Sequence, residues 1–135
     1  MNHFAAYHNP DTMGYGALDI NVHSQLTGQR IADPTRFIGA RLWTVTGERL
    51  AGSPRKHYSL RNTFVIDRIS PYTGAVQGFD KMVTGSDGMM FNPMIPLSDL
   101  DWFPEFLKRM GNFGFGIHPI MNSEYIAALQ AITRA

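Results

Sequence analysis

The chain has 135 residues and a mass of 15.1 kDa, the size of one domain, so we expect residues 1–135 to form a single domain. Hydrophobic residues make up 44% of the sequence, and the formal net charge is only +1. Such a chain can build a core and is neither a polycation nor an acidic disordered segment. It contains no cysteine, which excludes disulfides, thiolate metal sites and a cysteine nucleophile.

The composition also bears on the architecture and the location of the protein. Thirteen glycines and eight prolines indicate many short elements, with more strand than helix. No apolar run approaches the roughly 18 residues of a membrane span, and the first residues lack the basic and apolar regions of a secretion signal. We therefore expect a soluble, cytoplasmic protein.

The first quarter of the chain predicts one clear strand. Residues 3–8, HFAAYH, form a short apolar and aromatic run that ends at the turn sequence of residues 9–11. A glycine-rich loop is expected over residues 13–16. Residues 17–26 fit a strand or a helix equally well.

The middle of the chain predicts an antiparallel hairpin. Residues 40–47 and 56–69 alternate in hydrophobicity as strands do, and the segment between them is a basic, glycine- and proline-containing loop. Uninterrupted alternation along the second strand predicts that Leu60 and Phe64 face the same side.

The remaining third predicts loops, a short strand and two helices. Turn residues over 70–88 predict a loop with a short strand at most, and prolines within 89–97 predict an edge strand or an extended loop. A short helix is expected from Ser98 to Met110, with Pro104 in its first turn and Gly111 as its stop, followed by an aromatic strand over 112–120.

A final helix is expected from Ser123 to Thr133, with Asn122 as its N-cap. Its apolar residues recur at helical spacing and predict a stripe that faces the core, namely Tyr125, Ile126, Leu129 and Ile132.

The small net charge hides an uneven distribution. Residues 30–68 hold eight Lys and Arg against three Asp and Glu, a charge of +5, and the rest of the chain carries −4. Nine of the twelve cations are arginines, whose planar guanidinium suits phosphate and flat rings. A solvated strand surface would have the same composition, so either interpretation remains open.

The sequence contains none of the catalytic or phosphate-binding motifs G-x-S-x-G, Walker A or H-E-x-x-H. His3, His8 and Asp11 are close in sequence but fit no metal-ligand spacing. We therefore assign no catalytic residue, no cofactor and no metal.

Aromatic, amide and Arg residues interleaved with turns suit the stacking of a nucleobase and the recognition of its edge. The residues of this kind are Tyr7, His8, Asn9, Tyr15, Trp43, Tyr58, Arg61, Asn62 and Phe64. The alternative is that aromatics such as Trp43, Phe64, Phe113 and Phe115 only fill the core of a small barrel.

Residues 37–69, FIGARLWTVTGERLAGSPRKHYSLRNTFVIDRI, resemble the PUA-like β-barrel superfamily, especially its EVE- and ASCH-type domains. The matching positions are a glycine turn, a strand with a central Trp and a Y-x-L-x-x-x-F-V strand, at Gly39, Leu42, Trp43, Val45, Gly47, Tyr58, Leu60, Phe64 and Val65. The resemblance implies an α+β fold, a small pseudo-β-barrel of five or six mostly antiparallel strands with short helices packed at its ends.

EVE-like modules bind nucleic acid and occur beside restriction-type nucleases. They often hold a flipped, modified base in an aromatic pocket. The resemblance therefore implies a non-enzymatic module that recognises such a base, with DNA expected before RNA as its ligand. Together with the residue pattern, this assigns a base pocket to Tyr7, His8, Asn9, Trp43, Tyr58 and Arg61. The phosphate contacts are assigned to Arg49, Arg55 and Lys56. The modification, the number of strands bound and the oligomeric state are not specified by the sequence.

Two alternatives stay open. Some ASCH-type domains hydrolyse an acylated cytidine with a Lys, Thr and Glu set, and Lys56, Thr46 and Glu48 supply those residue types. A protein-interaction module is the other alternative. Its surface would consist of the apolar residues Met89, Met90, Phe91 and Trp102.

Overall fold

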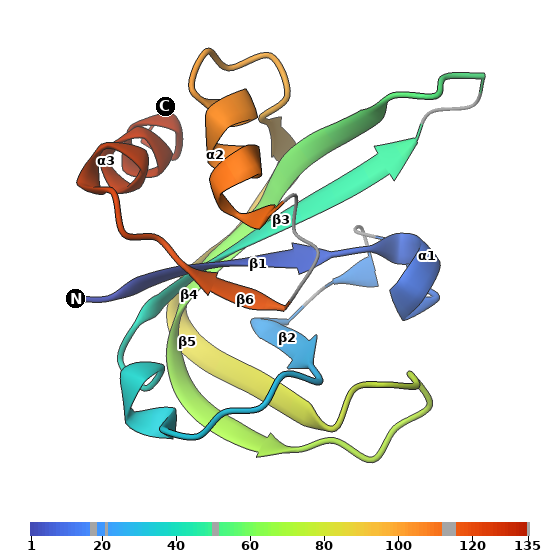
Figure 1. The fold of residues 1–135 in the computed structure, drawn as a ribbon, viewed down its shortest axis with the longest axis vertical. Coiled ribbons are helices and arrows are strands. Elements are labelled where there is room, and N and C mark those ends of the chain that lie inside the picture. The colour runs from blue at the N-terminus through green and yellow to red at the C-terminus, as the bar shows by residue number, and fades with distance from the viewer. Residues whose placement is uncertain (17–18, 21, 50–51, 112–115, 135) are drawn as a thin grey trace.

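A computed structural model describes residues 1–16, 19–20, 22–49, 52–111 and 116–134. The described elements, in chain order (Figure 1), are β1 (His3–His8), α1 (Pro10–Met13), β2 (Ser24–Thr27), the 3₁₀ helix η2 (Pro34–Arg36), β3 (Arg41–Arg49), β4 (Lys56–Pro71), β5 (Lys81–Pro96), α2 (Phe103–Arg109), β6 (Ile117–Pro119) and α3 (Ser123–Ile132).

All six strands belong to one sheet with the order β2-β5-β4-β3-β1-β6. Only the pairing of β1 with β3 is parallel, and the other four pairings are antiparallel. The predicted α+β class, with six mostly antiparallel strands and short helices, is confirmed. The predicted hairpin is β3 and β4, in which Arg49 pairs with Lys56.

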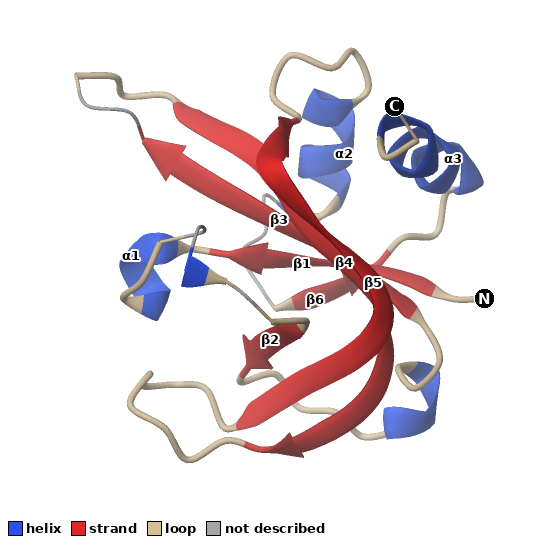
Figure 2. Cartoon of the chain, turned by 180° about the vertical axis from the view of Figure 1, so that it is seen from behind, coloured by secondary structure: helices blue, strands red, loops and turns tan. Residues whose placement is uncertain are grey.

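The sheet curls into a half-barrel, because β4 and β5 bend strongly along their length (Figures 1 and 2). Their register shifts at three places, and such bulges increase local twist and bend. Two glutamine side chains connect the β2 edge of the sheet to β6 and β1 at the other edge. Gln29 Oε1 accepts from Ile117 N at 2.7 Å, and Gln25 Nε2 donates to the Tyr7 carbonyl at 3.2 Å.

The two faces of the sheet have separate apolar cores. On the helix face, Trp43, Val45 and Leu60 pack with α2 and α3, which contribute Phe106 and Leu129. The second core lies on the opposite, barrel face. It contains Phe4, Ala6, Phe37, Ala40, Leu42, Phe64, Ile66, Val83 and Ile117. Both faces of β3 are therefore buried over most of its length.

The prediction that Leu60 and Phe64 share a face is wrong. Leu60 pairs with Val45 and Asn62 with Thr44, so Arg61 is an extra residue in β4. One inserted residue reverses the side-chain alternation beyond it. Leu60 consequently belongs to the core of the helix face and Phe64 to that of the barrel face.

The loop expected over residues 70–88 is shorter than predicted, because β4 extends to Pro71 and β5 begins at Lys81. Gly85 lies inside β5 rather than in a turn: a Cβ there would collide with the Val65 carbonyl and the Phe64 ring. Residues 89–96 belong to β5 and pair with β4, whereas the described ladder with β2 covers Lys81–Thr84. That part of β5 is thus an edge segment, as its prolines predicted.

Both predicted helices are present, but α2 begins at Phe103 rather than at Ser98, because Pro104 is tolerated only in the first turn of a helix. The final helix, α3, matches its predicted bounds to within one residue. Pro104 lies in the first turn of α2, and Gly111 follows with a positive φ of 61°. Asn122 caps α3, its side chain accepting from Glu124 N at 2.8 Å. The predicted apolar stripe faces the core of the helix face. The strand expected over 112–120 is β6 in its second half, and residues 112–115 lie outside the described part.

Among the described helices, none has the length and apolar character to cross a membrane.

We expect Gln29→Ala to lower the free energy of unfolding by about 1–2 kcal/mol, because the part-buried Ile117 N–H loses its acceptor. Urea denaturation would measure the change. Gln29→Glu keeps an acceptor oxygen and is the matched control. Equal loss in both variants would show that the hydrogen bond does not hold β6 in place.

Candidate functional site

The sheet divides the predicted base-pocket residues between its two faces. Tyr7 and His8 are consecutive in β1, so their side chains point to opposite sides. Tyr7 packs with Tyr58 against the core of the helix face. His8 pairs with Thr46 and belongs to the barrel face.

The helix face carries an aromatic cleft where β4 meets α2. The cleft has a volume of about 290 Å³ and is lined by Arg55, Lys56, Tyr58, Ser98, Phe103, Pro104 and Leu107. The rings of Tyr58 and Phe103 lie 5.4 Å apart, and the ring of Tyr7 lies 6.1 Å from that of Tyr58. The wall formed by residues 98–107 was not predicted, because nothing local in the sequence pairs these residues with the hairpin.

Gly47 allows the two tyrosines to approach each other. It pairs with Tyr58, and a Cβ at this position would collide with the Tyr7 hydroxyl and crowd the Tyr58 ring. Lys56 Nζ lies 5.5 Å from the centre of the Tyr7 ring and donates to its hydroxyl at 3.3 Å. Burial and the neighbouring Tyr7 raise the pKa of Tyr58, so its hydroxyl keeps its proton at neutral pH.

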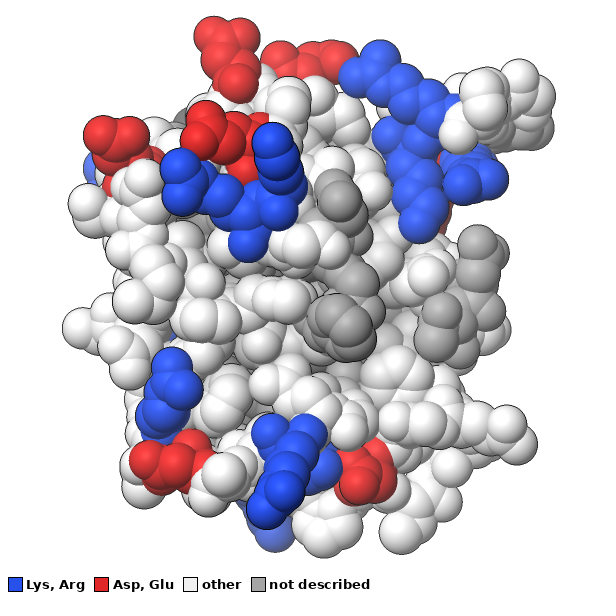
Figure 3. Space-filling model, viewed as in Figure 1, with Lys and Arg blue, Asp and Glu red and all other residues white. Residues whose placement is uncertain are grey.

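The predicted phosphate contacts lie together at the loop end of the hairpin, beside this cleft. Arg49 and Lys56 are directly opposite each other, and Arg55 lines the cleft. Figure 3 shows a cluster of cationic side chains over this outer part of β3 and β4. Arg55 lies 3.8 Å from Asp99, but both side chains are largely exposed, so the pair is weak and leaves Arg55 available.

Trp43 is buried in the core and is only 2% exposed. Its indole Nε1 donates to His3 Nδ1 at 3.0 Å, and the two rings are stacked with centres 6.1 Å apart. The structure thus offers no face of Trp43 to a base. Burial, reinforced by Arg41, lowers the pKa of His3 and keeps Nδ1 unprotonated, as this hydrogen bond requires.

Arg61 is buried at the bulge of β4, 6% exposed. Its guanidinium donates to the Ile20 carbonyl at 2.8 and 3.3 Å and to the Phe91 carbonyl at 2.9 Å. These bonds join the chain segment before β2 to the middle of β5. Arg61 therefore has a structural role and does not line the aromatic cleft.

His8 lies beside a second, smaller cavity of about 150 Å³. Its Nε2 donates to the Tyr15 carbonyl at 3.0 Å, and the two rings lie 4.8 Å apart. Asn9 follows β1, and its carbonyl accepts from Met13 N at 2.9 Å in the turn of α1. Of the predicted base pocket, then, Tyr7 and Tyr58 lie together, whereas His8, Trp43 and Arg61 have different surroundings.

The residues of the two alternative functions are not brought together. Lys56 pairs with Arg49, so it faces the side opposite to Thr46 and Glu48, and these three side chains do not converge. In the proposed interaction surface, Met89 is 54% exposed but Phe91 is only 8% exposed. Trp102 packs against Phe103, Phe106 and Tyr125.

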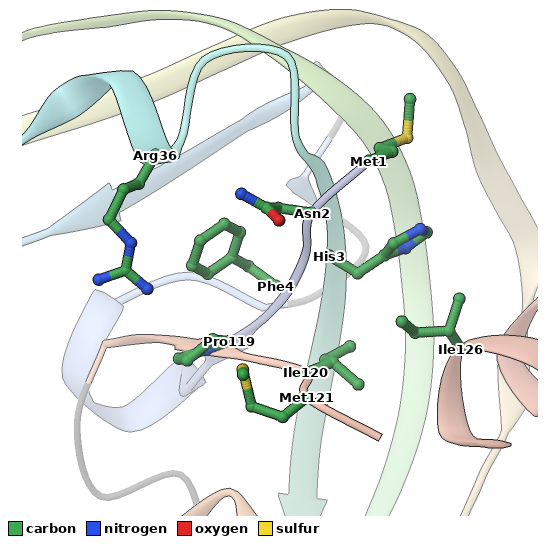
Figure 4. Close-up of a pocket in the computed structure, with 9 residues that line it drawn as sticks. All are labelled: Met1, Asn2, His3, Phe4, Arg36, Pro119, Ile120, Met121 and Ile126. Carbon is green, nitrogen blue, oxygen red and sulfur yellow. The ribbon is translucent and has the colours of Figure 1, made fainter. Parts of the chain in front are cut away.

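A third hollow, of about 430 Å³, surrounds the start of β1. Figure 4 shows Arg36 and Asn2 on one side of the N-terminal segment, with His3 and Ile126 on the other. The polar groups of this hollow therefore do not converge on one ligand position. Among the described residues, no group of three or more His, Asp and Glu could hold a metal ion.

No family model, curated protein or solved structure matches this chain. The resemblance to PUA-like domains consequently stays a prediction.

The two buried histidines make stability depend on pH. Burial is the main cause that lowers the pKa of both His3 and His8, so both rings are neutral in the folded protein. Histidines of the unfolded chain titrate near pH 6.5 and there bind more protons than the folded state. We expect the free energy of unfolding to fall as the pH drops from about 6.5 towards the lowered pKa values.

Urea denaturation at pH 7.5 and 5.5 would measure this loss. The double variant His3→Gln, His8→Gln should show a smaller difference between the two pH values. An unchanged difference would assign the pH dependence to other groups.

Proposed function

We propose that the protein is a non-enzymatic nucleic-acid-binding module that holds an unpaired or flipped base in the aromatic cleft. The observation that carries this proposal is the juxtaposition of two kinds of group at the loop end of the hairpin. Arg49, Arg55 and Lys56 lie beside the rings of Tyr58 and Phe103. Cations that follow a phosphate backbone, next to rings that stack bases, are typical of single-strand recognition.

The cleft supplies groups for the edge of a base as well as for its face. Ser98 Oγ accepts from Tyr58 N at 2.7 Å, which leaves its O–H to donate elsewhere. Lys56 and the protonated Tyr58 hydroxyl add donors at the same wall. A base can stack on an aromatic ring of the cleft only when it has left the base stack of its own strand. Extruding a base from that stack costs only a few kcal/mol.

The charge of the protein favours a pocket over a general affinity for polyanions. Of the central segment's cations, Arg61 is buried and bonded to carbonyls, and Arg41 bonds to Thr63 and Asp87. Arg30, Arg36 and Arg68 do not line the cleft, whereas Arg55 and Lys56 line it and Arg49 pairs with Lys56. Following the resemblance stated from the sequence, we propose that the protein prefers DNA to RNA. Oligonucleotides with modified bases are included in the test.

The aromatic ring at position 58 should carry much of the affinity. Tyr58→Leu keeps apolar volume against the core but removes the ring, and we expect it to weaken binding of a single-stranded oligonucleotide by about 1–3 kcal/mol, roughly 5- to 150-fold. Tyr58→Phe keeps the ring and should stay close to the original affinity. Fluorescence anisotropy would measure both, with plain, methylated and hydroxymethylated DNA and with RNA. Absence of binding to all of them would refute the proposal.

Few phosphates should be neutralised, so binding should depend weakly on salt. Three contacts predict a slope of log K against log salt of about −2 for a single strand. Arg55→Ala should make this slope less steep by about 0.7. Arg36→Ala removes an exposed arginine of η2, which precedes the opposite end of β3 from Arg49 and does not line the cleft, and is the control. A slope that Arg55→Ala leaves unchanged would place the phosphates elsewhere.

A further inference from the structure

Half of the barrel face is polar. Paired residues form rows across β1, β3 and β4, and the row Phe4, Leu42 and Phe64 is apolar. The next row along the strands is Ala6, Thr44 and Asn62, and the row after it contains His8 and Thr46. Adjacent rows on one face are about 7 Å apart.

Two buried polar atoms in the middle row have no partner. Thr44 Oγ1 and Asn62 Oδ1 lie in residues that are 0% exposed, and neither has a hydrogen-bond partner among the described residues. Leaving such a group unsatisfied costs about 1–3 kcal/mol. Native proteins contain few of these atoms, and they occur where water or a ligand completes the site.

A cavity lies beside His8, and neither Thr44 nor Asn62 of the middle row is among its lining residues. This is the cavity of about 150 Å³, lined by His8, Tyr15, Asp19, Ile20, Val22, Ser24 and Gln25. His8 is 1% exposed and Gln25 is 5% exposed, so the cavity has a built, buried wall. Its volume equals that of roughly five water molecules at about 30 Å³ each, which is enough for a small organic molecule.

The hydrogen bonds that His8 and Gln25 make in this wall use their donors and leave their acceptors. Gln25 Nε2 donates to the carbonyls of Tyr7 and Leu26, which leaves Oε1 as an acceptor. His8 donates from Nε2 to a carbonyl, so Nδ1 carries a lone pair in the neutral ring. Ser24 can accept as well, and Asp19 adds a carboxylate whose Oδ2 already accepts from Gly16 N at 3.1 Å, which leaves Oδ1. A ligand that fits must therefore be rich in N–H donors.

The local charge is negative. Asp19 lines the cavity, and Asp19 and Glu48 both act to raise the pKa of His8 against the larger effect of burial. Arg61 is the cation that contacts the cavity residue Ile20, but its guanidinium is bonded to backbone carbonyls and does not line the cavity. No lysine or arginine is among the lining residues.

We propose that this cavity binds a small organic cation with several N–H donors, an ammonium or amidinium group. The cation is held by the acceptors of Asp19, Ser24 and Gln25 and packs beside the rings of His8 and Tyr15. The site lies on the opposite face of β1 from the aromatic cleft, so the proposal does not rest on nucleic-acid binding.

Methylguanidinium and methylurea, which are nearly equal in shape but differ in charge, provide the test. Each is titrated against the ¹⁵N-labelled protein, and the imidazole of His8 and the side-chain amide of Gln25 are followed by NMR. We expect saturable shifts with methylguanidinium and at least tenfold weaker binding of methylurea. Acetate should not bind.

Asp19→Asn should weaken the binding of methylguanidinium at least tenfold, because the cation loses its carboxylate partner in the cavity. Asp19 is exposed, so the substitution should not disturb the core. Asp101→Asn removes another exposed carboxylate, outside the cavity lining, and should leave binding unchanged. Asp19→Asn should also leave oligonucleotide affinity unchanged, which separates this proposal from the previous one. Equal binding of both probes, binding insensitive to Asp19→Asn, or no saturation with either probe would overturn the proposal, the last showing a cavity filled by water alone.

Discussion

The extra residue at Arg61 sets the side-chain direction of β4, the strand that the two halves of the molecule share. Before the bulge, Tyr58 and Leu60 face the helices, and after it Asn62 and Phe64 face the barrel. The same residue then bonds the carbonyls of Ile20 and Phe91. A buried guanidinium that satisfies several carbonyls holds irregular backbone that cannot pair within a regular ladder. The bulge thus decides which residues of β4 join each core, and it coincides with one of the three register shifts between β4 and β5 along which the sheet curls.

Because the sheet is covered on both faces, neighbouring residues in one strand have different chemical surroundings. Tyr7 meets Tyr58 and Lys56 on the helix face, whereas His8 meets Tyr15 beside a polar cavity on the barrel face. The first environment is aromatic and cationic, which suits a base and its phosphate. The second is rich in acceptors and negatively charged, which suits a small cation. One short strand thus contributes to two unlike sites.

Much of the fold could be predicted from local patterns. The strand of residues 3–8, the hairpin and the helix capped by Asn122 follow from alternation, turn residues and capping, which are short-range effects. The segment over 70–88 could not be predicted in this way. Its glycines suggest turns, but Gly85 is required by the close approach of the Val65 carbonyl on a neighbouring strand, which is a long-range contact.

The candidate site shows the same division. The sequence by itself determined that cations are concentrated in residues 30–68 and that aromatic residues are interleaved with them, because composition and spacing are local properties. Only the tertiary structure decided which of them share a surface: it buried Trp43 against His3, used Arg61 to hold backbone and set Phe103 against Tyr58. The physical reason is that an inserted residue reverses the face of every residue beyond it, and α2 packs on one face only.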